Sequence, residues 1–266
     1  MMDTVIERPV KKAGFIGLVK DTLVMAKRDL LKIRHNPDSL MDVTLVPVIF
    51  MLLFTCLFGG AIAGNISAYL PTVVPGIFVF QMISATSGAG TQLREDIETG
   101  VFDRFKSLPI ARTAPLTGIL LTDIVRYVMA AIFSLGTGIV MGWRPSAGFV
   151  YLIPACLIVF FACWCVSWIF ALVGILVKSS GTISGVSMLI SMLLGFLSNA
   201  IVSPDTFPAP IRAFAKINPV THLVNAFNAI VNTRTFGTEA IMALGVSAVF
   251  AIIIIPVTVV VYHKTI

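Results

Sequence analysis

Charged side chains are scarce in this sequence. Only 12% of its 266 residues are Asp, Glu, Lys or Arg, while 57% are hydrophobic; soluble domains carry about 25% charged residues. The scarcity is also local, because the 51 residues between Asp42 and Arg94 contain no charge. A helix needs about 20 apolar residues to cross the hydrocarbon core of a bilayer. The composition therefore excludes a soluble enzyme and predicts a polytopic membrane protein.

Residues that build catalytic or metal sites are also few. The four cysteines form no C-x-x-C pair, and the three histidines are scattered, so neither set predicts a metal centre. The phosphate-binding motif G-x-x-x-x-G-K-[ST] does not occur. The longest polar stretch, 1–42, is shorter than the roughly 50 residues at which independent domains begin. We expect neither a cofactor nor catalysis in this chain, and if ATP powers the protein, it does so on another polypeptide.

Apolar runs separated by turn signals predict an all-α bundle of six transmembrane helices. Their approximate ranges are 43–62, 72–93, 115–141, 149–177, 182–202 and 240–262. Segments assigned to the cytoplasmic side hold 14 of the 19 Lys and Arg residues, and outer loops hold four. This bias favours cytoplasmic N- and C-termini. The net charge of +6 is thereby explained as a topology signal, without nucleic-acid binding.

The N-terminal segment 1–42 contains a predicted amphipathic helix at about 15–35. Its apolar positions share one helical stripe: Ile16, Val19, Leu23, Ala26, Leu30 and Ile33. Basic residues occupy the other faces, so the helix is expected to lie in the cytoplasmic headgroup layer of the membrane. Packing on a protein partner is the alternative, and the two do not exclude each other.

The segment between the second and third predicted spans mixes acidic, basic and apolar residues. Val101, Phe102, Phe105 and Leu108 follow a helical spacing, which predicts a short helix stopped by Pro109. An apolar face that exposes two phenylalanines needs a host, either the bilayer surface or a groove on a soluble protein. The mixed charge favours a protein groove.

Three motifs stand out in the chain: the first lies in 98–112, the second combines 42–47 with 58–61, and the third is 218–222. The characteristic residues of the first are Glu98, Gly100, the Arg104-Phe105 step, Leu108-Pro109 and Arg112. Together the three motifs resemble one family, the permease subunits of type-2 ABC exporters, and most closely its daunorubicin-resistance subgroup. The coupling helix implied by the resemblance comprises Glu98, Gly100, Val101, Phe102, Asp103, Arg104, Phe105, Lys106, Leu108 and Pro109.

The resemblance implies a division of labour between subunits. The chain would pair with a second copy and with two cytoplasmic ATPase subunits, which bind ATP and Mg²⁺. It would export hydrophobic or amphipathic, drug-like compounds across the cytoplasmic membrane of a prokaryote. A lipid or a lipid-linked glycan is an alternative cargo. An ion-gradient-driven carrier and an intramembrane enzyme are the other classes considered, but the sequence has no convincing internal repeat and no catalytic constellation.

Polar residues inside the predicted spans form two groups. Asp123 and Arg126, at i and i+3, are expected to pair in the bundle interior, mainly as a structural ion pair and otherwise in a substrate or proton role. The second group has small or polar side chains at helical spacing: Ser184, Ser187, Ser191, Gly195 and Ser198 in the fifth span, with Gln81, Ser84, Ser87 and Thr91 in the second. Such stripes form packing seams or line a pathway.

The outer segment 203–239 is broken by Pro204, Pro208, Pro210 and Pro219. It is too polar for a seventh span, so we expect a pair of short helices at the outer surface. They would form either an outer gate or a cap on the bundle.

Overall fold

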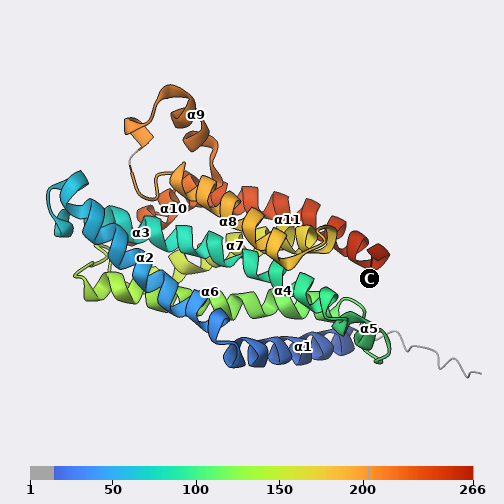
Figure 1. The fold of residues 1–266 in the computed structure, drawn as a ribbon. Coiled ribbons are helices and arrows are strands. Elements are labelled where there is room, and N and C mark those ends of the chain that lie inside the picture. Colours follow the sequence, from blue (N-terminus) through green and yellow to red (C-terminus); the bar gives the residue numbers. More distant parts are fainter. Residues whose placement is uncertain (1–14, 203, 266) are drawn as a thin grey trace, which may run out of the picture.

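The computed structural model describes residues 15–202 and 204–265, and all regular structure in these ranges is helical (Figure 1). The predicted all-α class is therefore confirmed. The α-helices are α1 (Phe15–His35), α2 (Pro37–Ala63), α3 (Ile66–Ala85), α4 (Ser87–Glu98), α5 (Val101–Lys106), α6 (Ala114–Val140), α7 (Leu152–Leu176), α8 (Ser180–Phe196), α9 (Ala209–Ile217), α10 (Pro219–Thr233) and α11 (Thr238–Thr265). Short 3-10 turns lie at Phe149–Tyr151 and Pro204–Thr206.

Within the described ranges, five helical segments are long and apolar enough to cross a membrane: Leu40–Ala61, Ile66–Glu98, Ala114–Val140, Phe149–Leu176 and Thr238–Thr265. The second joins α3 and α4 into 33 residues. At 1.5 Å per residue this is about 50 Å, which exceeds the ~30 Å of the hydrocarbon core. The segment is therefore longer than a perpendicular crossing needs, and its charged residues Arg94, Glu95, Asp96 and Glu98 all lie at the α4 end.

A break at Thr86 separates α3 from α4. The Thr86 hydroxyl donates to the carbonyl of Ile83 over 2.6 Å, and the Ser87 hydroxyl donates to that of Ser84 over 2.8 Å. Hydroxyls that bond back to the preceding turn compete with the helical ladder and bend helices. Two such bonds at adjacent positions explain why the helix is interrupted here.

The fifth predicted span, 182–202, differs from the observed helix, because α8 ends at Phe196 and the chain then turns through 197–202. Asn218 donates to the carbonyls of Leu194 and Leu197 over 2.7 and 3.0 Å, which satisfies the end of α8. At Gly76 on α3, an added Cβ would lie 1.6 Å from the carbonyl oxygen of Ala200. The missing side chain of Gly76 thus lets this turn pack directly on α3.

Helix α1 packs along the first half of α6 (Figure 1). Its buried face carries Met25, Asp29 and Ile33, whereas Leu23 and Leu30 of the predicted apolar stripe are exposed. The face that holds α1 on the bundle is therefore rotated from that stripe. Much of the stripe faces away from the chain, in the way expected of a helix that also contacts lipid.

Helix α7 lies at the centre of the bundle, where it packs against α4 and α11. Close approach to α4 depends on glycine, because an added Cβ at Gly174 would lie 2.5 Å from the carbonyl oxygen of Gly90. The C-terminus and α5 lie at one end of the bundle, and α9 and α10 lie toward the other (Figure 1). The two outer helices expected in 203–239 correspond in position to α9 and α10.

Candidate transport cavity and coupling segment

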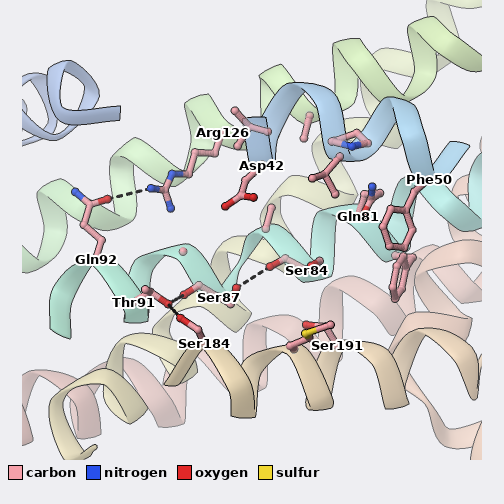
Figure 2. A pocket seen from close by; sticks show the side chains of 18 of the residues that line it. Asp42, Phe50, Gln81, Ser84, Ser87, Thr91, Gln92, Arg126, Ser184 and Ser191 are labelled. Carbon is pink, nitrogen blue, oxygen red and sulfur yellow. Dashed lines mark hydrogen bonds between the residues drawn. The ribbon is translucent and has the colours of Figure 1, made fainter. Parts of the chain in front are cut away.

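A cavity of about 800 Å³ opens between α2, the α3–α4 segment, α6 and α8 (Figure 2). Its walls come from helices that are distant in the sequence, and they combine aromatic, hydroxyl, amide and charged side chains. Binding cavities for drug-sized molecules have volumes of about 300–1,000 Å³ and mostly apolar walls with a few polar groups. The size and composition of this cavity fit a ligand of that class.

One end of the cavity is aromatic. Phe50 and Phe54 of α2 stack with centroids 5.7 Å apart, and Phe50 lies 5.9 Å from Phe80 of α3. Phe196 of α8 completes the group, 6.0 Å from both Phe54 and Phe80. Gly195 allows this contact, because a Cβ there would lie 2.0 Å from the ring of Phe80. The four rings form an apolar wall that suits a flat aromatic body.

Hydroxyl groups line the middle of the cavity. Thr91 on α4 donates to the carbonyl of Ser87 over 3.3 Å, and its hydroxyl lies 3.4 Å from that of Ser184 on α8 (Figure 2). Ser84 and Gln81 line the same wall one and two turns along α3. The two polar stripes predicted in different spans therefore face each other across the cavity.

The serine stripe of α8 is divided between packing and lining. Ser187, Ser191 and Gly195 are buried, while Ser184 is exposed. Ser191 also lines the cavity. Beyond the helix, the Ser198 hydroxyl donates to the carbonyl of Gly195 over 2.6 Å. The packing seam and the pathway lining thus share one helical face.

Asp123 and Arg126 of α6 lie 3.6 Å apart, measured from Oδ1 to Nη1. Arg126 Nη2 donates to Gln92 Oε1 over 3.2 Å, and Arg126 lines the cavity together with Gln92. An added Cβ at Gly88 would lie 1.8 Å from Arg126 Nη1. Glycine at position 88 therefore makes room for the guanidinium to reach across α4 (Figure 2).

The segment 98–109 bends sharply at Gly100, whose φ of 69° is the left-handed conformation that glycine adopts without strain. Helix α5 follows, ending at Lys106 before Pro109. Phe102 is buried, with its ring centroid 5.9 Å from that of Tyr262 on α11. The apolar face expected to be exposed here is therefore smaller than the spacing indicated, because one of its two phenylalanines packs inside the chain.

The remaining residues of this segment are mostly accessible. Phe105 is half-buried beneath the Arg28 guanidinium, which lies 5.2 Å from its ring centroid. Leu108 is 48% exposed. Asp103, Arg104 and Pro109 are exposed as well, whereas the side chain of Lys106 is outside the described residues. A mixed charged and apolar surface thus remains for a partner.

Glu98 links the end of α4 to the start of α8. Its Oε1 accepts from the backbone amide of Ser180 over 2.9 Å, and its Oε2 accepts from the Ser180 hydroxyl over 3.1 Å. Arg94 Nε lies 3.2 Å from Glu98 Oε1. Carboxylates stabilise helix N-termini because the first amides lack helical partners. Nothing in the sequence signalled this contact, since the two residues are 82 positions apart.

A second cluster joins α1 to α4. Arg28 Nη1 lies 2.8 Å from both Asp29 and Asp96, and Lys32 Nζ lies 3.1 Å from Asp96 and 3.4 Å from Glu95. Burial raises the pKa of Asp29 to about 6, against the opposing effect of Arg28. Sequence reasoning missed this cluster; the sign available was Asp29, an acid at the border of the apolar stripe of a basic helix, one helical turn from Ile33.

Comparison with known proteins identifies the family. A family model described as ABC-2 type transporter matches residues 20–232. The chain belongs to this membrane family. The permease is 36% identical over 258 residues, 97% of this chain and 90% of the relative, to the daunorubicin resistance ABC transporter permease protein DrrB1 of Streptomyces coeruleorubidus.

More distant relatives agree with this. The permease is 21% identical over 209 residues to a probable doxorubicin resistance ABC transporter permease protein, DrrC, of Mycobacterium tuberculosis (strain CDC 1551 / Oshkosh), covering 78% of this chain and 75% of the relative. It is 32% identical over 125 residues to the doxorubicin resistance permease protein DrrB of the same strain, 42% of each chain. The permease is thus a multi-pass cell membrane protein whose family works with an ATPase partner, which confirms the predicted class.

Proposed function

We propose that the permease forms the membrane pathway of an ATP-driven exporter for hydrophobic or amphipathic drug-like compounds. The amphipathic cavity of about 800 Å³ carries this proposal, because it lies among the spanning helices and suits a drug-sized ligand. The relatives are named for resistance to daunorubicin and doxorubicin, so aromatic antibiotics are the first cargo to test. A lipid or lipid-linked glycan is the second.

In the proposed layout, α8 is a sixth membrane crossing and both termini are cytoplasmic. Its 17 residues give about 26 Å of helix, and the turn 197–202 extends this toward the outer surface. Helix α1 then lies at the cytoplasmic surface, where its exposed apolar face contacts lipid and Lys20 and Lys27 approach anionic headgroups. Helices α9 and α10 cover the outer end.

A second copy of the chain is proposed to close the open side of the cavity. Helices α2 and α8 border that side, and their outward faces carry exposed apolar residues such as Leu57, Leu189 and Leu193. Two copies facing each other would enclose a shared pathway. Two ATPase subunits, which bind ATP and Mg²⁺, would then dock at the end of the bundle that carries α5.

The residues at this end suggest how ATPase movement reaches the cavity. A push on α5 would act on α11 through the Phe102–Tyr262 contact and on α4 through the Gly100 turn. Glu98 would then carry the movement of α4 directly to Ser180 at the start of α8. Both α4 and α8 line the cavity, so displacement of either changes its shape.

The test is reconstitution. The tagged permease is purified from membranes of its native host, the co-purifying ATPase is identified by mass spectrometry, and both are placed in sealed vesicles. We expect daunorubicin to accumulate on addition of ATP, and not when the phosphate-binding lysine of the ATPase is replaced. Accumulation driven by a proton gradient without any ATPase would contradict the proposal.

A further inference from the structure

Three nitrogen donors without partners lie along the cavity wall, those of Gln92 and Arg126 at its polar end and that of Gln81 beside the aromatic end (Figure 2). Among the described side chains that line it, the buried polar atoms without a hydrogen-bond partner are Gln81 Nε2, Gln92 Nε2 and Arg126 Nε. All three are N–H groups, and the two glutamines are each 5% exposed. Buried donors are normally paired. A ligand that supplies acceptors would complete this wall, whereas one that supplies only donors would not.

The hydrogen bond between Arg126 and Gln92 decides which of their polar atoms lack a partner. Arg126 donates to Gln92 Oε1 over 3.2 Å, so the amide nitrogen of Gln92 is left as the group without a partner. The guanidinium reaches the cavity because Gly88 has no side chain to block it. Asp123 lies behind Arg126, at 3.6 Å, and is not part of the cavity wall. The pair is thus neutral as a unit, but only its donor member lines the cavity.

The other charged groups of the lining are engaged within the chain. Glu95 lies 3.4 Å from Lys32, which also bonds to Asp96. Asp42 lines the same cavity and interacts within the chain as well. The buried polar atoms of the described lining that lack a partner are therefore all donors.

We propose that the cavity selects aromatic amphiphiles whose polar end carries hydrogen-bond acceptors, such as carbonyl, hydroxyl or carboxylate groups. The aromatic body packs against Phe50, Phe54, Phe80 and Phe196, and the acceptors meet Gln92 and Arg126. This rests on the proposed function, since it assigns the cargo class of the same cavity. It also gives the orientation of the bound cargo, whose acceptor-bearing end would lie toward α4 and α6.

Binding of three dansyl probes tests the assignment without ATP. Dansylglycine ends in a carboxylate, dansylcadaverine ends in an ammonium group, and dansylamide serves as the small neutral reference. Each is titrated by fluorescence into the permease–ATPase complex in phosphatidylcholine nanodiscs, and empty nanodiscs are subtracted. We expect dansylglycine to bind about tenfold more tightly than dansylcadaverine, the factor expected for a hydrogen bond to a charged group.

Variants separate recognition from folding. Arg126→Gln combined with Asp123→Asn keeps a neutral pair in the bundle and removes the charged donor. Gly88→Ala leaves every charge in place and displaces the guanidinium. Both are expected to weaken dansylglycine binding about tenfold and to leave dansylcadaverine within about twofold. Arg144→Gln, at an exposed position away from the cavity, is the matched control and should change neither.

The outcomes are distinguishable from those of the export assay. Equal or tighter binding of dansylcadaverine in the unaltered complex would overturn the proposed selectivity. Equal weakening of both probes in the two variants would also overturn it, because that is a general loss of structure. Absence of saturable binding of all three probes counts against it too. Failure of ATP-driven export with the binding preference intact would instead overturn the proposed function alone.

Discussion

Replacement of Asn218 should destabilise the outer end of the bundle. Its Oδ1 accepts from the amide of Val220 over 2.9 Å, which caps α10, and its Nδ2 donates to the carbonyls of Leu194 and Leu197 at the end of α8. Loss of an N-cap costs about 1 kcal/mol. Each partly buried carbonyl that loses its donor adds about 1 kcal/mol. Asn218→Ala should therefore lower the free energy of unfolding by about 3 kcal/mol.

The Asp variant distinguishes the two roles. Asn218→Asp retains an acceptor for the cap but places a carboxylate beside two carbonyl oxygens and donates to neither at neutral pH. We expect it to be no more stable than the Ala variant, although Asp and Asn are equally good N-caps on their own. Unfolding by SDS titration in mixed micelles measures all three proteins. Asn232→Ala on the same helix is the control and should cost less than about 1 kcal/mol.

Near-native stability of Asn218→Asp would refute the reasoning, since Asn218 would then act as a cap alone. The end of α8 at Phe196 would need another cause. A loss well below 1 kcal/mol in Asn218→Ala would refute it as well, because two helix ends would then be satisfied without this side chain.

Three further predictions concern coupling, pH and packing. Glu98→Ala should reduce ATP-driven export while ATP hydrolysis persists. Glu98→Gln keeps an acceptor for the amide of Ser180 and should therefore retain more of the export activity. Equal export by the two variants would contradict the proposed coupling of α4 to α8 through Glu98. Burial raises the folded-state pKa of Asp29 from its ordinary 3.8 to about 6, so the unfolded chain gives up this proton at a lower pH than the folded one. The unaltered permease should therefore lose stability relative to Asp29→Asn as the pH rises from 4 to 6. Parallel pH profiles of the two proteins would exclude this contribution. Gly174→Ala should lower the melting temperature, because the added Cβ would lie 2.5 Å from a backbone carbonyl oxygen. Gly60→Ala is the control and should not, because there is open space around Gly60. Similar melting temperatures of the two variants would contradict the close approach of α7 and α4.

The helical class could be predicted from the sequence because it depends on local quantities. Apolar run length defines the segments that can span, and Gly64-Asn65 lies at the turn between α2 and α3, whereas Gly59-Gly60 is still helical within α2. The side-chain cap at the start of α3 agrees with this, since Asn65 accepts from the amide of Ala68. Features that depend only on residues within a few positions of one another can be predicted from the sequence.

Features that depend on distant partners could not be predicted in the same way. The end of α8 is decided by Asn218, more than twenty residues further along the chain. The face by which α1 packs on the bundle could not be predicted, because the apolar stripe indicated only the side toward lipid or a partner, whereas Met25 and Asp29 beside it are the buried positions. Periodicity gives the faces of a helix, but in a membrane protein lipid competes with the bundle for the apolar one.

The cavity illustrates the same limit and also what sequence reasoning can offer. Ser184, Gln81 and Arg126 were each notable because a polar side chain within an apolar span is costly and needs a partner. Sequence spacing alone could not show that three different helices bring them to one cavity. The polar groups of the lining differ in whether they have a hydrogen-bond partner. The Ser184 hydroxyl donates to a carbonyl of its own helix, whereas Arg126 Nε and the amide nitrogens of Gln81 and Gln92 have no partner. The polar groups that a fold leaves without partners are those a cargo can satisfy, and here they select for acceptors.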